Sequence, residues 1–220
     1  MALGGAPPRT RPLTRPLSRP DAVVTRAPPG SVGRVPRLLH LNGPPGIGKS
    51  TLAALFAHRH PGTLNLDIDT LHQLVGGWRD PATHAHELLR PVALAMAATH
   101  LRGGRDVVLP QYLGRLDAIE AFERAALGEG AEFVEVVLLD DRLAALERFD
   151  RREDDSAWGR HNRRLVADQG GSRFLEDMYD HLLAVVEERP RAVVLRSEYG
   201  AVEQTYAALL GALSDDRPGH

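Results

Sequence analysis

One run of eight residues constrains this chain most: Gly43 to Ser50, which reads Gly-Pro-Pro-Gly-Ile-Gly-Lys-Ser. Its spacing, G-x-x-x-x-G-K-S, is typical of a loop whose backbone N–H groups surround a phosphate. Such a loop needs a strand before it and a helix after it, because the helix N-terminus adds its positive end to the anion site. Both flanks fit, since a short apolar run covers 37–42 and a helical pattern covers 49–58. The run therefore predicts an α/β fold.

The rest of the domain alternates between apolar runs and helical patterns. Further strands are expected at 63–67, 106–109, 133–139 and 192–195, and helices at 71–101, 116–127, 142–152, 172–188 and 202–213. Pro91 should end or kink the helical stretch over 71–101. Continuous apolar strands separated by helices predict a three-layer sandwich with a five-stranded parallel sheet, plus a helical lid. In such folds ligands bind beyond the carboxyl ends of the strands.

Composition sets the limits of the domain and excludes several chemistries. Residues 1–37 hold seven Arg, one acid and eight of the 16 prolines, so we expect a disordered, untargeted leader over 1–36, a folded domain over 37–214 and a tail over 215–220. The chain has no cysteine, which excludes thiol catalysis and cysteine-ligated metals. Residues 38–220 carry a balance of -8, which argues against a nucleic-acid partner. The longest apolar run, Val92–Ala98, is too short for a membrane helix, so we expect a cytoplasmic protein with no membrane partner.

The phosphate loop also contains the only lysine of the chain, Lys49, against 26 arginines. A compact ammonium on a thin stem fits inside a loop of amides, whereas a planar guanidinium is too broad. Lys49 is expected to reach the β- and γ-phosphates of ATP, and the Ser50 hydroxyl to ligate Mg²⁺. The expected nucleotide-binding residues are Gly43, Pro45, Gly46, Ile47, Gly48, Lys49, Ser50 and Thr51.

With this loop the chain resembles the P-loop NTPase superfamily, in particular its branch of small-molecule kinases. The run Asp67-Ile68-Asp69-Thr70-Leu71 resembles the D-x-D segment of shikimate and gluconate kinases. It also resembles the segment with the catalytic aspartate in chloramphenicol phosphotransferase and zeta-type toxins. The resemblance implies that Asp69 accepts the proton of a substrate hydroxyl and that Asp67 holds a Mg²⁺-bound water. Alternation along a strand would put both carboxylates on one side; the alternative is that one of them only caps the next helix.

Arginines and aromatic residues supply the other candidates. In kinases of this branch lid arginines close over the phosphates, which implies that Arg148 and Arg152, in a lid over 148–171, stabilise the transferred charge. The acids interleaved there leave open a plain surface helix of ion pairs. The 70–104 insertion is the expected acceptor-binding region. Candidate acceptor contacts are Asp69, Trp78, Arg79, Arg90, Gln111 and Arg115, the last of which could equally be a solvated helix start.

The favoured hypothesis is a phosphotransferase that uses ATP and Mg²⁺ and acts on a hydroxyl of a small molecule, such as an antibiotic, a sugar or a nucleoside. The segment after the third strand lacks the Asp-Gly expected of nucleoside-monophosphate kinases, which argues against that activity. The alternative is a nucleotide-binding ATPase switch that controls a protein partner. A polynucleotide kinase is disfavoured by the negative charge, and the sequence leaves a homodimer open.

Overall fold

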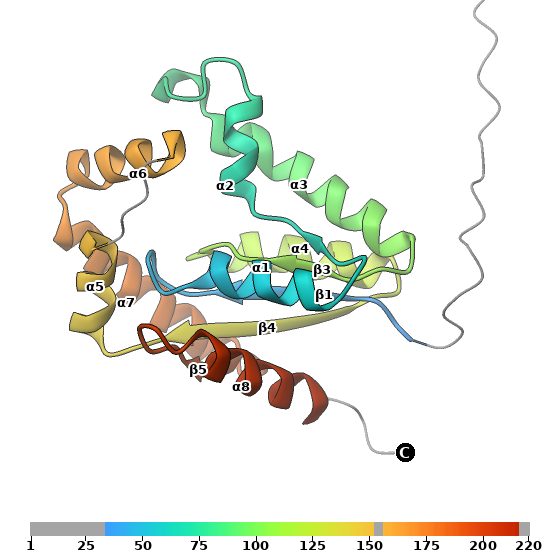
Figure 1. Cartoon of the computed structure of the whole chain (residues 1–220). Coiled ribbons are helices and arrows are strands. Elements are labelled where there is room, and N and C mark those ends of the chain that lie inside the picture. The colour runs from blue at the N-terminus through green and yellow to red at the C-terminus, as the bar shows by residue number, and fades with distance from the viewer. Residues whose placement is uncertain (1–33, 152–155, 216–220) are drawn as a thin grey trace, which may run out of the picture. The chain divides into compact units, whose positions relative to one another are not determined.

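The computed structural model describes residues 34–151 and 156–215. Most of the predicted leader and tail, and Arg152, lie outside the described residues. The described chain folds around a parallel sheet in the order β2-β3-β1-β4-β5 (Figure 1). Its strands are β1 (Arg37–Asn42), β2 (Leu64–Asn65), β3 (Val107–Leu109), β4 (Glu132–Leu139) and β5 (Val193–Arg196). The predicted five-stranded parallel sheet is therefore confirmed.

Helices cover both faces of this sheet, as the alternation predicted (Figure 1). One face packs against α1 (Lys49–Arg59) and α8 (Val202–Asp215), and the other packs against α3 (Ala85–Arg102) and α4 (Leu116–Gly128). The remaining helices are α2 (Ile68–Leu71), the 3₁₀ turns η1 (His72–Leu74) and η2 (Pro81–Thr83), α5 (Arg142–Arg151), α6 (Ala157–Asp168) and α7 (Ser172–Glu188). Among the described helices, none is long and apolar enough to cross a membrane.

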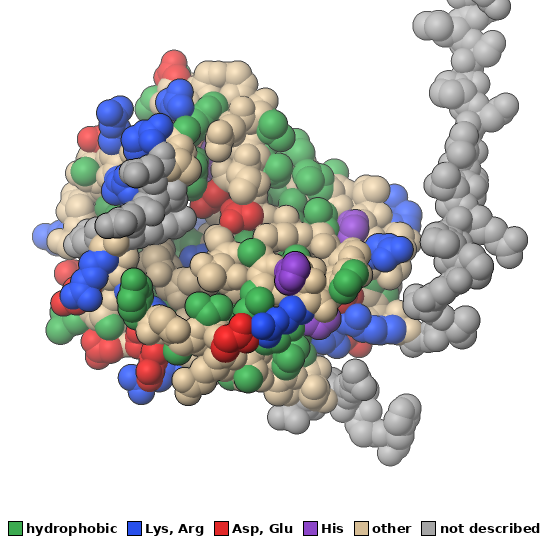
Figure 2. All heavy atoms as spheres, viewed as in Figure 1, with side chains coloured by type: hydrophobic (Ala, Val, Ile, Leu, Met, Phe, Trp, Pro, Cys, Tyr) green, Lys and Arg blue, Asp and Glu red, His purple; other side chains and the backbone are tan. Residues whose placement is uncertain are grey.

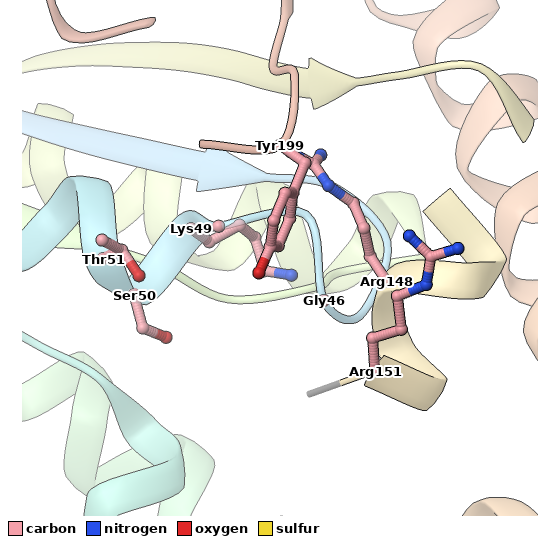
Figure 3. A pocket seen from close by; sticks show the side chains of 8 residues that line it. Gly46, Lys49, Ser50, Thr51, Arg148, Arg151 and Tyr199 are labelled. Atoms are coloured by element: carbon pink, nitrogen blue, oxygen red, sulfur yellow. The ribbon is translucent and has the colours of Figure 1, made fainter. Parts of the chain in front are cut away.

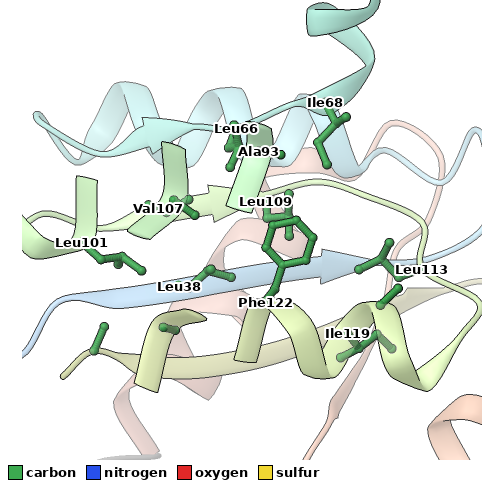
Figure 4. Close-up of a cluster of buried hydrophobic side chains, with 14 of the residues drawn as sticks. Leu38, Leu66, Ile68, Ala93, Leu101, Val107, Leu109, Leu113, Ile119 and Phe122 are labelled. Atoms are coloured by element: carbon green, nitrogen blue, oxygen red, sulfur yellow. The ribbon is translucent and has the colours of Figure 1, made fainter. Parts of the chain in front are cut away.

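The side chains on the two faces of β1 belong to two different hydrophobic clusters. Leu38 packs with Leu109 of β3 and Phe122 of α4 in the cluster of Figure 4, whereas Leu39 and Leu41 join the opposite cluster. Because successive side chains of a strand point to opposite faces, a strand with helices on both sides must be apolar throughout. This double burial holds the carboxyl end of β1, and therefore the phosphate loop, in a fixed place.

The structure corrects one detail of the predicted elements and specifies two others. β2 ends at Asn65, so Asp67 and Asp69 do not alternate along a strand; instead the chain turns into α2, because the Asp67 carboxylate accepts a hydrogen bond from the Asp69 N–H and caps the helix. Pro91 does not end α3, which continues to Arg102 while its buried face packs into the core. The polar stretch before α7 forms α6, whose first turn is capped by Ser156.

Candidate active site

The phosphate loop joins β1 to α1 and is confined by two neighbours. At Gly43 a Cβ atom would lie 2.6 Å from the carbonyl oxygen of Leu138 in β4. Gly46 has a φ of +84° and faces the backbone of α5, where its Cβ would lie 3.0 Å from the Phe149 nitrogen. Only glycine combines this conformation with so close an approach. The glycines of the motif therefore serve the packing of the loop as well as its curl.

Lys49 lies within the curl of the loop. Its Nζ donates hydrogen bonds to the carbonyl oxygens of Gly43 (2.8 Å) and Pro44 (3.0 Å). The Ile47 side chain is buried in the core, so this residue offers only backbone groups to a ligand. Its carbonyl oxygen accepts a hydrogen bond from the Ser197 hydroxyl at 3.0 Å, which braces the loop from the end of β5.

A pocket of about 500 Å³ opens over the loop (Figure 3). Its lining combines residues of the loop and of α1 with Arg148 and Arg151 of α5 and Tyr199 of the segment after β5. The predicted residues among the lining are Gly46, Gly48, Lys49, Ser50, Thr51 and Arg148. Among the described residues that line the pocket, three have cationic side chains and none is acidic, so their charge suits a polyphosphate.

Arg148 lines this pocket, and its contacts hold its side chain in place. Its guanidinium is buried, makes an ion pair with Asp140 (Nη1 to Oδ2, 3.2 Å) and donates to the carbonyl oxygen of Ser197. Its Cζ atom lies 5.6 Å from the centre of the Tyr199 ring. Arg151, one turn further along α5, makes an exposed ion pair with Glu147 at 2.8 Å, as the alternative of a surface helix of ion pairs expected.

The two aspartates of the D-x-D segment lie beside the loop at the start of α2. The Asp67 carboxylate accepts a hydrogen bond from the Asp69 N–H at 3.1 Å, and the Ser50 hydroxyl lies beside it. Burial raises the pKa of Asp67, and the charge of Asp69 raises it further, whereas the Ser50 hydroxyl, the Asp69 N–H and Lys49 oppose the rise. Ser50 and Asp67 thus form an oxygen-donor pair of the kind that Mg²⁺ prefers, and a cation beside them would favour the charged carboxylate.

The candidate acceptor residues divide into three places. Trp78 and Arg79 lie together on the insertion, with the Arg79 Cζ atom 4.6 Å from the centre of the Trp78 ring. Arg115 is exposed and makes two hydrogen bonds of 3.0 Å to Asp117, whose charge also interacts with Arg90.

Gln111 follows β3 and is buried. Its carbonyl oxygen accepts a hydrogen bond from His40 Nε2 at 2.9 Å. Its side-chain oxygen Oε1 is buried and has no hydrogen-bond partner among the described residues.

Sequence reasoning missed Asp140 and Arg151 as residues of the site. Asp140 directly follows β4, and an acidic residue just after a strand is the sequence signal that could have identified it. On the face shown in Figure 2, acidic side chains lie near the centre and Lys and Arg side chains gather over α6. The basic residues of α6 include Arg160, Arg163 and Arg164.

Comparisons with known proteins agree with this architecture. The protein family described as AAA domain matches residues 38–175. The fold is similar to that of the Deinococcus radiodurans tunicamycin resistance protein, with 16% identity, a TM-score of 0.56 and coverage of 82% of this chain and 96% of that one. It is also similar to a gluconokinase from Sinorhizobium meliloti 1021, with 17% identity, a TM-score of 0.52 and coverage of 84% and 100%. No curated protein matches the chain.

Proposed function

The chain belongs to the AAA-domain family, and from that premise we propose that it is a phosphotransferase that uses ATP and Mg²⁺ and moves the γ-phosphate to a hydroxyl of a small molecule. The observation that supports this most is the contact between Asp67 and Ser50, which brings two carboxylates beside the phosphate loop. A loop that only bound nucleotide would not need a second carboxylate there. The names of the two similar structures, a gluconokinase and a tunicamycin resistance protein, support the proposal of an antibiotic, sugar or nucleoside as the acceptor.

The pocket over the loop is the proposed ATP site. Loop N–H groups and Lys49 bind the β- and γ-phosphates. The adenine ring of ATP is proposed to lie against Tyr199, because an aromatic ring beside the buried guanidinium of Arg148 offers a flat surface for stacking. The Arg148 guanidinium is proposed to contact the phosphates, and its ion pair with Asp140 holds it in position to do so. Arg152 is proposed as a second phosphate contact of the predicted lid over 148–171.

Ser50 and Asp67 would hold Mg²⁺, Asp67 through a water, and the ion would neutralise developing phosphate charge. Asp69 is the proposed general base. The acceptor oxygen attacks the γ-phosphorus, the bond from that phosphorus to the bridging oxygen of ADP breaks, and the hydroxyl proton passes to the Asp69 carboxylate. The insertion over 70–104 would bind the acceptor, with Trp78, Arg79, Arg90, Gln111 and Arg115 as its candidate contacts.

Mass spectrometry tests this proposal directly. The protein is incubated with ATP, Mg²⁺ and pooled hydroxyl compounds, and a phosphate-sized mass gain is sought in each compound. Asp69→Asn should lower kcat by about a hundredfold or more, since a positioned base contributes that much. Asp177→Asn is the matched control, because Asp177 is an exposed aspartate of α7 and lies outside the proposed site.

Two results would contradict the proposal. If Asp69→Asn transfers phosphate as fast as the wild type, the base is misassigned. If no compound gains phosphate while a protein partner binds only in the presence of ATP, the chain is a nucleotide-dependent switch.

A further inference from the structure

The turn that carries Asp69 is too short to be stable alone. α2 has only four residues, and a single helical turn in water is unfavourable without tertiary support. One support is the Asp67 cap at its N-terminus. A second support, besides the burial of Ile68 in the core, is His72, whose Nδ1 lies 3.2 Å from the carbonyl oxygen of Ile68. Since a carbonyl only accepts, Nδ1 carries the proton, and the His72 ring closes the turn around Asp69.

The same ring contacts a helix that is distant in sequence. His72 is 3% exposed and stacks on Trp158 in the first turn of α6, with ring centres 4.1 Å apart and an interplanar angle of 29°. On the insertion, the His86 ring lies 6.0 Å away at 17°. Trp78 meets His161 of α6 edge-on at 5.1 Å. These five residues, which we name the histidine–tryptophan cluster, join α6 to the insertion.

The surroundings of the cluster favour the uncharged form of two of its histidines, His86 and His161. Burial lowers the pKa of His86, and Arg90 and His72 lower it further, whereas Glu87 opposes them. Burial also lowers the pKa of His161, with His72, Arg79 and Arg164 acting in the same direction. Uncharged rings can stack closely without the cost of burying a charge. The cluster therefore suits a close contact between α6 and the insertion at neutral pH.

We propose that His72 is a positioning residue: its ring links the packing of Trp158 on the insertion to the orientation of the Asp69 carboxylate. The proposal rests on the role of Asp69 in the proposed function. Without Trp158 the ring of His72 loses its support and the turn around Asp69 loosens. Without the His72 ring, α6 loses the stacking contact that Trp158 makes next to the end of α2. The packing of α6 on the insertion and the alignment of Asp69 are thus coupled. The Asp69 carboxylate is oriented for proton transfer only when α6 is packed there.

A double-mutant cycle tests this link. His72→Asn keeps a side-chain N–H but removes the ring, and Trp158→Ala removes its partner. Each should lower kcat by about tenfold and leave the KM for ATP unchanged, because the ATP pocket is separate. The double variant should lose no more than either single one, since both changes break one link. Trp158→Phe, which keeps a flat ring, should recover most of the loss. His58→Asn, an exposed histidine of α1, is the control.

Losses that multiply in the double variant would overturn the proposal. A rise in the KM for ATP as large as the fall in kcat, in either single variant, would also overturn it. So would full activity of Trp158→Ala.

A second measurement does not depend on activity. Both tryptophans of the chain, Trp78 and Trp158, belong to the cluster. In a Trp78→Phe background the fluorescence therefore reports Trp158 alone. His72→Asn should shift its emission to the red and increase its quenching by acrylamide; unchanged emission and quenching would overturn the stack. If the wild type phosphorylates no compound but the shift occurs, the proposed function fails while the link between α6 and α2 is retained.

Discussion

Protonation of a buried histidine should make the fold sensitive to acid. His40 lies in β1 with no exposed surface, and burial lowers its pKa to about 4. Its Nε2 donates to the Gln111 carbonyl oxygen at 2.9 Å, while Nδ1 has no hydrogen-bond partner among the described residues. Lys49 and Arg189 add repulsion to a charged ring, whereas the Gln111 carbonyl and the Glu135 carboxylate, 3.8 Å from Nδ1, favour the charge but do not outweigh burial. The folded state therefore binds the proton much more weakly than the unfolded chain does.

The size and sign of the effect follow from linkage. An unfolded histidine titrates near pH 6.5, so as the pH falls the unfolded chain takes up the proton first and is stabilised. The stability that a neutral His40 allows is present above that pH and is lost as the pH falls toward about 4. With these two pKa values, the free energy of unfolding should drop by about 2 kcal/mol between about pH 7.5 and about pH 5.

Urea denaturation at the two pH values measures this drop. His40→Gln removes the titrating ring, and its amide N–H can still donate to Gln111. The wild type should lose about 2 kcal/mol more than this variant, because ionisable groups away from His40 contribute equally to both proteins. His58→Gln, at an exposed site, should behave like the wild type. An equal loss in His40→Gln and the wild type would refute the reasoning.

Three further predictions concern the phosphate loop and its pocket. A lysine-directed reagent should modify one side chain, Lys49, and ATP should protect it from the reagent. Peptide mass spectrometry measures the labelling of Lys49 with and without ATP, and equal labelling would contradict the proposed site. Gly46→Ala should lower the free energy of unfolding by more than about 1 kcal/mol, because it adds a contact with Phe149 to the strain of a positive φ. Thermal unfolding compares it with Gly104→Ala, which has a positive φ in open space, and an equal effect would show that the contact is harmless. Tyr199→Ala should raise the KM for ATP by about fivefold and Tyr199→Phe should not, since stacking needs only the ring; an unchanged KM in Tyr199→Ala would place the base elsewhere.

Some of this molecule could be predicted because the relevant residues are contiguous. Gly43 to Ser50 contains the curl of the loop, its lysine and its hydroxyl in one run, so local backbone geometry suffices. The strands were found for a similar reason, since a strand buried on both faces must be apolar throughout. The segment at Asp67 was harder, because the same letters suit a strand end or a helix cap. Its side chain decides between them by accepting the Asp69 N–H.

The sequence by itself therefore determined the fold class and the phosphate loop, because period and spacing act over a few neighbouring residues. Only the tertiary structure decided which distant groups complete the site. Asp140 holds Arg148 against the loop, Ser197 braces Ile47, and His72 meets Trp158. Each of these contacts joins segments that approach only after the sheet and its helices have packed. No local pattern specifies them, because their energy comes from burial and pairing between elements rather than from either segment alone.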